Sequence, residues 1–267
     1  SILIMQSILP YSMRSELVID PSTKILFWNL HPDCLVPVLI PLPYLRNIQK
    51  RSFKFYKFLS KTLFRSLLFS LRGFFNTAIE KKSILFMDQP NLDNTRKHLF
   101  LKDLEVNFVQ VPALKSNYNI VKVLNQYQIL NFTWIGRLCD FKSYILIYCI
   151  KKMSLLSSKL KLKIQYSIIG DGPFLKKIQE LNVNHDFFNL ELLGALKTNE
   201  LGNYLENNTD ILTAMGTSAL EGAKLGIPTI LLDYSYFSIV GDYKFRWLHD
   251  TKNFDLAHEI SDSDIKE

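Results

Sequence analysis

Short apolar segments alternate with helical patterns along residues 131–235, and this alternation constrains the fold more than any other feature. Five segments have the length of β-strands: Phe132–Gly136, Leu162–Gly170, Asn189–Gly194, Asp210–Ala214 and Ile227–Leu232. Apolar residues at helical spacing occupy four segments among them: Tyr144–Ser157, Phe174–Leu181, Thr198–Asn207 and Ser218–Leu225. Strand-helix-strand repetition predicts parallel strands joined by right-handed crossovers, and therefore a doubly wound α/β domain.

Glycines lie where these strands end: Gly136, Gly170, Gly172, Gly194 and Gly216. Open α/β sheets bind ligands beyond the carboxyl ends of their strands, and a residue without a Cβ lets backbone approach a ligand closely. The alternative is that the loops need glycine only for a positive φ. The number of glycines at one edge favours a small-molecule site there.

The net charge of +7 is divided unevenly along the chain. Residues 1–130 hold 17 Lys and Arg against 8 Asp and Glu, whereas residues 131–267 hold 15 against 17. Nine of the ten glycines lie in the second segment and eight of the ten prolines in the first. We therefore expect two domains, 1–130 and 131–267. A hydrophobic content of 48% excludes disordered and collagen-like classes.

The cysteines Cys34, Cys139 and Cys149 are odd in number and form no C-x-x-C pair. They predict neither a disulfide framework nor a structural zinc site, which favours a reducing compartment. The sequence contains no apolar run of 18 residues and no basic residue at its start, so neither a membrane span nor a secretory signal is predicted. Because position 1 is not Met, we expect an N-terminal domain that is incomplete.

Two cations follow the first strand of the second segment, in Gly136-Arg-Leu-Cys-Asp-Phe-Lys142. Arg137 offers a planar fork and Lys142 a point charge, a combination that suits a diphosphate. The alternatives are a surface salt bridge for Arg137 and a solvated helix start for Lys142.

Two further loops suit a phosphorylated ligand. In Gly170-Asp171-Gly172-Pro173 the amides of the turn are expected to face a ligand; the loop is no dinucleotide fingerprint, because Leu175 stands where G-x-G-x-x-G needs glycine. In Gly216-Thr217-Ser218-Ala-Leu-Glu221 the amides open a helix. Glu221 stands three residues after Ser218, so it fits a capping box as well as a contact to a ligand hydroxyl.

The order GRL-x-x-x-K, IIGDGP, LLG and MGTSALEGAKLGIPTILLD resembles the donor-binding domain of GT-B-fold glycosyltransferases of the family-4 type, over residues 131–235. The resemblance implies two Rossmann-like domains and transfer of a sugar from a UDP- or GDP-sugar to a saccharide or lipid-linked acceptor, with retention of configuration. It implies a role in cell-surface polysaccharide synthesis, such as lipopolysaccharide or capsule, at the inner face of the plasma membrane.

The resemblance also implies roles for individual residues. Arg137 and Lys142 would hold the diphosphate, the loop from Gly170 to Pro173 would line the cleft, and Leu193, Gly194 and the residues to Leu196 would meet the base. Gly216, Thr217 and Ser218 would meet phosphate through amides, and Glu221 would bind the ribose. The family's E-x7-E pattern has its first glutamate at position 213, where this chain has Thr213.

No metal is expected as a cofactor, because fixed cations and helix amides can stabilise the leaving diphosphate. The D-x-D pattern of metal-dependent GT-A enzymes occurs once, at Asp262 and Asp264, in a polar tail without a preceding strand.

The first segment is expected to bind the acceptor. Its predicted strands, Lys24–Leu30 and Ser83–Met87, lead into His31 and into a turn that contains Asp88 and Asn91. His31 is a candidate for contact with the reacting centre; the alternative is a hydrogen-bonded turn residue. Asp88 and Asn91 are expected to form the turn first.

A basic stripe lies between these strands on what the spacing predicts to be one helix: Arg51, Lys54, Lys57, Lys61 and Arg65. Aromatic and aliphatic residues occupy its other faces, a composition that suits an anionic membrane surface. A solvated face opposite the core is the alternative. Nucleic acid is not expected as a partner, because no RNA- or DNA-binding motif accompanies the stripe.

Two other classes of function remain open from the sequence. One is an enzyme like a nucleotide-sugar epimerase, although its carboxylate and histidine catalysts are not found. The other is a truncated or catalytically impaired paralogue that binds a membrane or a partner.

Overall fold

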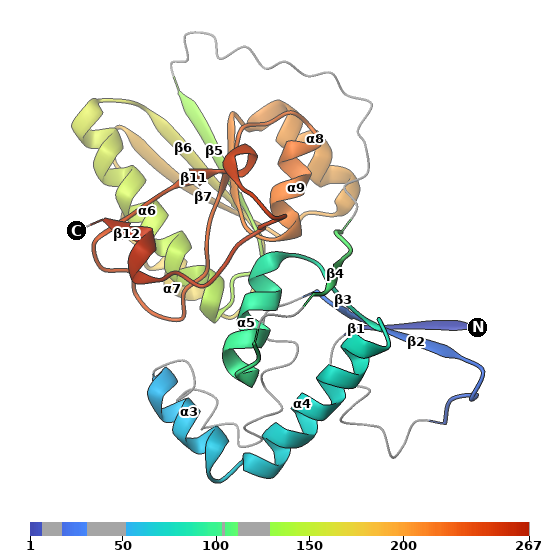
Figure 1. Cartoon of the computed structure of the whole chain (residues 1–267). Coiled ribbons are helices and arrows are strands. Elements are labelled where there is room, and N and C mark those ends of the chain that lie inside the picture. Colours follow the sequence, from blue (N-terminus) through green and yellow to red (C-terminus); the bar gives the residue numbers. More distant parts are fainter. Residues whose placement is uncertain (7–17, 31–51, 103–104, 112–128, 267) are drawn as a thin grey trace. The chain divides into compact units, whose positions relative to one another are not determined.

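The computed structural model describes residues 1–6, 18–30, 52–102, 105–111 and 129–266. The chain divides into two compact units (Figure 1). Unit 1 consists of Ser1–Val111 and Asn253–Asp255, and unit 2 consists of Pro112–Lys252 and Leu256–Glu267.

Unit 1 contains a four-stranded parallel sheet in the order β1-β2-β3-β4. Its strands are β1 (Ile2–Gln6), β2 (Lys24–Asn29), β3 (Ile84–Phe86) and β4 (Asn107–Phe108). Its helices are α3 (Phe53–Lys61), α4 (Arg65–Glu80) and α5 (Gln89–Leu99). The two strands expected from the sequence are present as β2 and β3, and β1 and β4 extend the sheet on either side.

The core of unit 1 forms where the helices meet this sheet. Its fully buried aromatic side chains are Tyr56 of α3, Phe75 of α4 and Phe86 of β3. The Tyr56 hydroxyl donates a hydrogen bond of 2.9 Å to the carbonyl of His98, which fixes α3 against the end of α5. The described part of unit 1 therefore has a hydrophobic core of its own.

Unit 2 contains a six-stranded sheet in the order β11-β9-β8-β5-β6-β7. Its parallel strands are β5 (Leu130–Ile135), β6 (Ile164–Ile169), β7 (Phe188–Gly194), β8 (Ile211–Ala214) and β9 (Thr229–Leu231). Its helices are α6 (Asp140–Leu160), α7 (Leu175–Gln179), α8 (Thr198–Asn208) and α9 (Thr217–Ala223). Each strand and helix overlaps the segment predicted for it.

Helices cover both faces of this sheet, α6 and α7 on one and α8 and α9 on the other (Figure 1). Side chains alternate along β5 accordingly: Trp134 faces the α6 core, and Ile135 faces the core formed by α8 and α9. The doubly wound α/β class predicted from the sequence is confirmed by this arrangement.

The remaining short elements of unit 2 follow β9. They are β10 (Asp242–Tyr243), β11 (Arg246–Trp247), the 3-10 helices η2 (Leu248–Asp250) and η3 (Asp262–Asp264), and β12 (Ile265–Lys266). β11 pairs antiparallel to β9 at the edge of the sheet, and β10 pairs with β12. The D-x-D pattern thus forms η3 rather than a loop beyond a sheet strand.

Candidate functional site

The strand order reverses between β5 and β8 of unit 2. From β5 the chain moves to β6 and β7 on one side, whereas β8 lies against the other side of β5 and leads to β9. In open α/β sheets such a reversal leaves a crevice beyond the strand ends, because the two loops diverge to opposite faces. The predicted residues Arg137 and Gly216 follow β5 and β8, so both stand at the strand ends where the order reverses.

Helix α6 begins just beyond the end of β5, and its N-cap residue provides no side-chain cap. Its N-cap residue, Cys139, adopts an extended conformation and makes no side-chain hydrogen bond to the helix. In the first turn the Asp140 carboxylate accepts from the amide of Phe141 at 2.9 Å. A helix of 21 residues concentrates positive potential at its first turn, so this end of α6 suits an anion.

Arg137 and Lys142 lie on either side of this helix start, as the sequence predicts. Arg137 is exposed and Lys142 is half-buried. Burial lowers the pKa of Lys142 below its usual range and the positive charge of Arg137 lowers it further, while Cys139 acts in the opposite direction. A bound diphosphate would stabilise the charge of Lys142 and pair with that of Arg137.

The loop from Gly170 to Pro173 is interlocked with the loop after β5. A Cβ on Gly170 would lie 1.9 Å from the carbonyl oxygen of Gly136, and one on Gly172 would lie 2.4 Å from that of Leu138. The amide of Gly170 donates to the carbonyl of Gly194, and the amide of Gly172 donates to the Asp171 carboxylate. The expectation that these two amides face a ligand is therefore wrong, because both are used within the protein.

The end of β7 carries a β-bulge at a predicted site residue. Ile168 is paired with Leu192 and Ile169 with Gly194, so Leu193 is the extra residue. Leu193 is half-buried against the core formed by α8 and α9. A bulge redirects the strand end, and here it brings the Gly194 carbonyl to the Gly170 amide at 2.8 Å.

The segment after β8 holds the third predicted element. Gly216, with a φ of 63°, is the N-cap of α9, and its amide donates to the Leu256 carbonyl at 2.6 Å. Because the cap is Gly216 and not Ser218, the capping box between Ser218 and Glu221 is absent. Glu221 instead forms an ion pair with Lys224 one turn later, with its side chain 38% exposed. Its carboxylate is thus accessible.

Position 213 lies within β8, not in the loop beyond it. Thr213 is completely buried, and its hydroxyl is 2.8 Å from that of Tyr166 and donates to the Thr133 carbonyl at 3.1 Å. A glutamate there would be buried in the sheet, because position 213 lies inside β8 and its side chain is fully covered. Only Met215 and Gly216 separate β8 from α9. The E-x7-E spacing of the family therefore does not apply to this chain. A glutamate at position 213 would not reach a ligand beyond the strand ends, so its absence removes no ligand contact.

A buried carboxylate after β9 is a feature that the sequence reasoning missed. Asp233 accepts hydrogen bonds from the Tyr243 hydroxyl at 2.7 Å, from the His258 amide at 3.0 Å and from the guanidinium of Arg246 through Nε and Nη2. The sequence did contain a sign of it, because Asp233 is an acidic residue directly after the apolar segment Ile227–Leu232. Since its oxygens are saturated by donors from β10, β11 and the following chain, Asp233 anchors these segments to the sheet.

In unit 1, polar side chains are buried beyond β2 and β3. Asp88 is the N-cap of α5 and accepts from the amide and the side chain of Asn91 at 2.9 and 2.7 Å, so the segment expected to be a turn is the start of a helix. Burial raises the pKa of Asp88 to about 6. The neighbouring Asn29 donates to Thr95 at 3.4 Å. His31, the catalytic candidate, lies outside the described residues.

The basic stripe is divided between two helices, which corrects the expectation of one. α3 ends at Lys61 and α4 begins at Arg65. Arg51 lies outside the described residues; the other four basic residues are exposed. Four large apolar side chains are exposed beside them: Phe55 (41%), Phe58 (60%), Leu63 (75%) and Phe69 (58%). We call Lys54–Phe69 the elbow.

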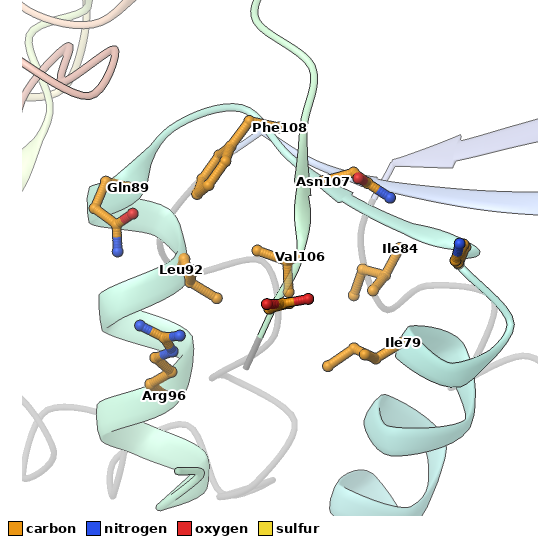
Figure 2. A pocket seen from close by; sticks show the side chains of 10 residues that line it. Ile79, Ile84, Gln89, Leu92, Arg96, Val106, Asn107 and Phe108 are labelled. Atoms are coloured by element: carbon orange, nitrogen blue, oxygen red, sulfur yellow. The ribbon is translucent and has the colours of Figure 1, made fainter. Parts of the chain in front are cut away.

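Unit 1 also contains a cavity of about 530 Å³ between α4, α5 and the strands β3 and β4 (Figure 2). Gln89, Leu92 and Arg96 reach it from α5, and Figure 2 shows Val106 and Phe108 of the β4 region on the facing side. Lys82, Arg96 and Glu105 bring both signs of charge to its wall. The cavity therefore suits a ligand with donors and acceptors more than a strongly charged one.

Comparison with known proteins gives limited similarity. No protein-family profile matches the chain, and no curated protein matches it in sequence. Among solved structures, the chain is similar to the lipopolysaccharide outer core galactosyltransferase WaaB in its apo form, with 14% identity, a TM-score of 0.44 and coverage of 85% of this chain and 79% of that one.

Among the described residues, no helix combines the length and apolarity needed to cross a membrane.

Proposed function

We propose that the protein is a glycosyltransferase that takes a sugar from a nucleoside-diphosphate sugar and transfers it to a hydroxyl of a saccharide or lipid-linked saccharide. Unit 2 binds the donor in the crevice between the loops after β5 and β8. The resemblance of residues 131–235 to family-4 enzymes supports a UDP- or GDP-sugar as the donor and retention at the anomeric carbon.

One observation carries this proposal: the start of a long helix and two cations meet at the point where the strand order reverses. The first turn of α6 supplies the positive end of a long helix, and Arg137 and Lys142 add two full charges. The leaving diphosphate gains negative charge as the glycosidic bond breaks. Groups placed to meet developing charge are each worth about 3 kcal/mol of transition-state stabilisation.

The other side of the crevice supplies contacts to the rest of the nucleotide. Glu221 presents an accessible carboxylate that can accept from ribose hydroxyls, with Lys224 holding its position. Thr217 and Ser218 form the first turn of α9, whose amides have no partner within the helix. The chain from Leu193 to Leu196, at the end of β7, is assigned to the base. Catalysis needs no metal in this scheme, so EDTA is expected to leave sugar transfer unchanged.

A calorimetric titration with UDP and GDP tests the donor site. We expect saturable binding of at least one nucleotide, and a loss of tenfold or more in affinity in Arg137→Ala and in Lys142→Ala. Lys159→Ala is the matched control, because Lys159 is an exposed lysine at the far end of the same helix. Failure of the wild-type chain to bind either nucleotide would sink the assignment.

We also propose that the elbow places the protein on an anionic membrane surface, at the cytoplasmic face where lipid-linked acceptors are met. Lys54, Lys57 and Lys61 of α3 stand among the exposed side chains of Phe55 and Phe58. The guanidinium of Arg65 lies 5.5 Å from the ring centroid of Phe69. Aromatic side chains that enter the interface beneath a ring of cations stabilise peripheral binding, at about 1 kcal/mol for each cation near the surface.

Co-sedimentation with vesicles of mixed phosphatidylcholine and phosphatidylglycerol tests the elbow. The triple variant Lys54→Glu, Lys57→Glu, Lys61→Glu is expected to bind at least tenfold more weakly. Its control changes three exposed lysines elsewhere in unit 1, as Lys24→Glu, Lys81→Glu, Lys102→Glu. Equal loss in both triples would mean that binding follows net charge and not the elbow.

A further inference from the structure

A second cavity, of about 350 Å³, lies on unit 2 between α6, α7 and the segment 238–239. Its apolar wall is formed by Ile147 and Leu155 of α6, by Leu181 just beyond α7 and by Ile239. The volume lies within the range typical of small-molecule sites and is too small for a docked helix. The cavity shares no residue with the candidate donor site.

The charged residues that line this cavity are all lysines. Lys151, Lys152 and Lys177 contribute to its lining, and none of the described residues that line it is acidic. Lys152 is neutralised by Asp242 at 2.5 Å. Lys177 is held with its ammonium 4.8 Å from the ring centroid of Tyr144, a position fixed by an aromatic face and not by a carboxylate. Lys151 is exposed.

This local chemistry differs from that of the surrounding chain. Residues 131–267 hold 15 basic and 17 acidic residues, so the run of lysines at the cavity is not a general property of the unit. Beside the lysines the surface is strongly apolar: Leu155 is 66% exposed and Val240, next to Ile239, is 85% exposed. Exposed apolar side chains around a cavity mark a binding surface more often than isolated ones do.

We infer that this cavity binds one anionic, single-chain amphiphile, a lipid with a phosphate headgroup. The alkyl chain lies along Ile147, Leu155, Leu181 and Ile239, and the phosphate is met by Lys151 and Lys177. A free phosphate would leave the apolar wall in water, and an uncharged lipid would leave the two ammonium groups without a counter-charge. A ligand that contacts both the apolar wall and the lysines must have both an alkyl chain and a negatively charged headgroup.

Calorimetric titration of the full chain with octyl phosphate, below its micelle concentration and with excess UDP present throughout, tests the inference. UDP occupies the candidate donor site, so that site does not contribute to the signal, and the paired variants below separate the second cavity from the elbow. Saturable binding is expected, with at least tenfold weaker binding of inorganic phosphate and of the uncharged octyl tetraethylene glycol ether.

Paired variants separate the site from general charge and apolarity. Lys151→Glu with Lys177→Glu is expected to weaken octyl phosphate binding tenfold or more, whereas Lys159→Glu with Lys176→Glu, the same change of charge at exposed lysines outside the lining, is expected to leave it within twofold. Leu155→Asp is expected to weaken it and Leu156→Asp is not. All four variants replace exposed residues, and an unchanged thermal midpoint verifies folding.

Three results would overturn the inference: no saturable binding of octyl phosphate, equal binding of inorganic phosphate or of the uncharged ether, or equal losses in the paired variants. UDP titrations of the same variants keep the two proposals apart. If Lys151→Glu with Lys177→Glu loses octyl phosphate but binds UDP normally, the second cavity is separate; absence of UDP binding in the wild-type chain would affect only the donor site.

Discussion

Lys142 carries a charge that its surroundings disfavour. Burial and the neighbouring Arg137 both lower its pKa, while Cys139 acts in the opposite direction. A protein keeps such a group where something else stabilises it, and a bound diphosphate would do so. The carboxylates of Glu221 and Asp88 differ in the same respect. Glu221 has a positive neighbour in Lys224, whereas the charge of Asp88 is disfavoured by burial.

UDP binding is expected to weaken as the pH rises, and to do so at a lower pH than if Lys142 had the pKa of an ordinary lysine. Because the pKa of Lys142 is lowered, its ammonium is lost below the usual range, and its attraction for the diphosphate is lost with it. Lys142→Arg stays charged, so its affinity should hold to higher pH. Calorimetry between pH 7 and pH 10 on both chains measures this, and identical profiles would contradict it.

Glu221 is expected to act on the ribose and not on the phosphates. Glu221→Ala should weaken UDP binding about tenfold, the value of one hydrogen bond to a charged group, and leave inorganic pyrophosphate unaffected. Lys224→Ala, which removes the ion-pair partner but not the carboxylate, should have a smaller effect. Equal weakening of UDP and pyrophosphate in Glu221→Ala would place this residue elsewhere.

Asp88 is expected to make unit 1 less stable as the pH rises from 4 to 6. Its pKa is raised from 3.8 to about 6, so the folded state binds the proton more tightly and stability falls as that proton is lost. The shift corresponds to roughly 2–3 kcal/mol. Asp88→Asn keeps an N-cap acceptor, so urea denaturation at pH 8 should show a more stable protein with a flatter pH profile. An unchanged pH profile in Asp88→Asn would refute this.

At the scale of elements, the loops at the carboxyl edge of the unit 2 sheet are built onto one another. Leu138 donates to the Asp171 carbonyl at 2.9 Å and accepts from the Phe174 amide at 3.0 Å, while Gly170 donates to Gly194. The loops after β5, β6 and β7 are therefore one layer of backbone. This layer sets the position of Arg137, so its glycines support the site without touching a ligand through their own amides.

Gly170→Ala is expected to destabilise the protein by more than about 3 kcal/mol. The added Cβ would lie 1.9 Å from a backbone oxygen, and the φ of 150° is unfavourable for alanine. Gly202→Ala is the control, because Gly202 lies within α8 with no atom within 4 Å of the added Cβ. That change should stabilise the helix by about 0.5–1 kcal/mol. Thermal unfolding of both variants measures the contrast, and similar midpoints would contradict it.

The sequence predicted the elements of unit 2 well, because strand-length apolar runs and helical spacing alternate there without interruption. The break between α3 and α4 escaped it because the basic residues keep a helical interval across the break. The Phe64 amide donates to the Leu59 carbonyl, and the Thr62 hydroxyl donates to the Phe58 carbonyl. These bonds turn the chain, although the spacing of the basic residues continues unchanged. Hydrogen bonds of this kind leave no periodic signal.

At the scale of the molecule, the uneven charge of the sequence separates into local surfaces. Exposed cations of unit 1 gather with exposed aromatics at the elbow, while unit 2 places cations at the start of α6 and again at the second cavity. The two cations at the start of α6 could be predicted because they follow a strand directly. The second cavity could not, because its lining comes from α6, α7 and residues 238–239, which only the fold brings together.

The central claim is that a nucleoside diphosphate binds at the start of α6. A crystal structure of the chain grown with UDP tests this most directly. The account predicts the diphosphate within hydrogen-bond distance of the Arg137 guanidinium and the Lys142 ammonium, with the ribose toward Glu221. A diphosphate bound away from both cations, with the α6 start in contact only with water, would contradict it.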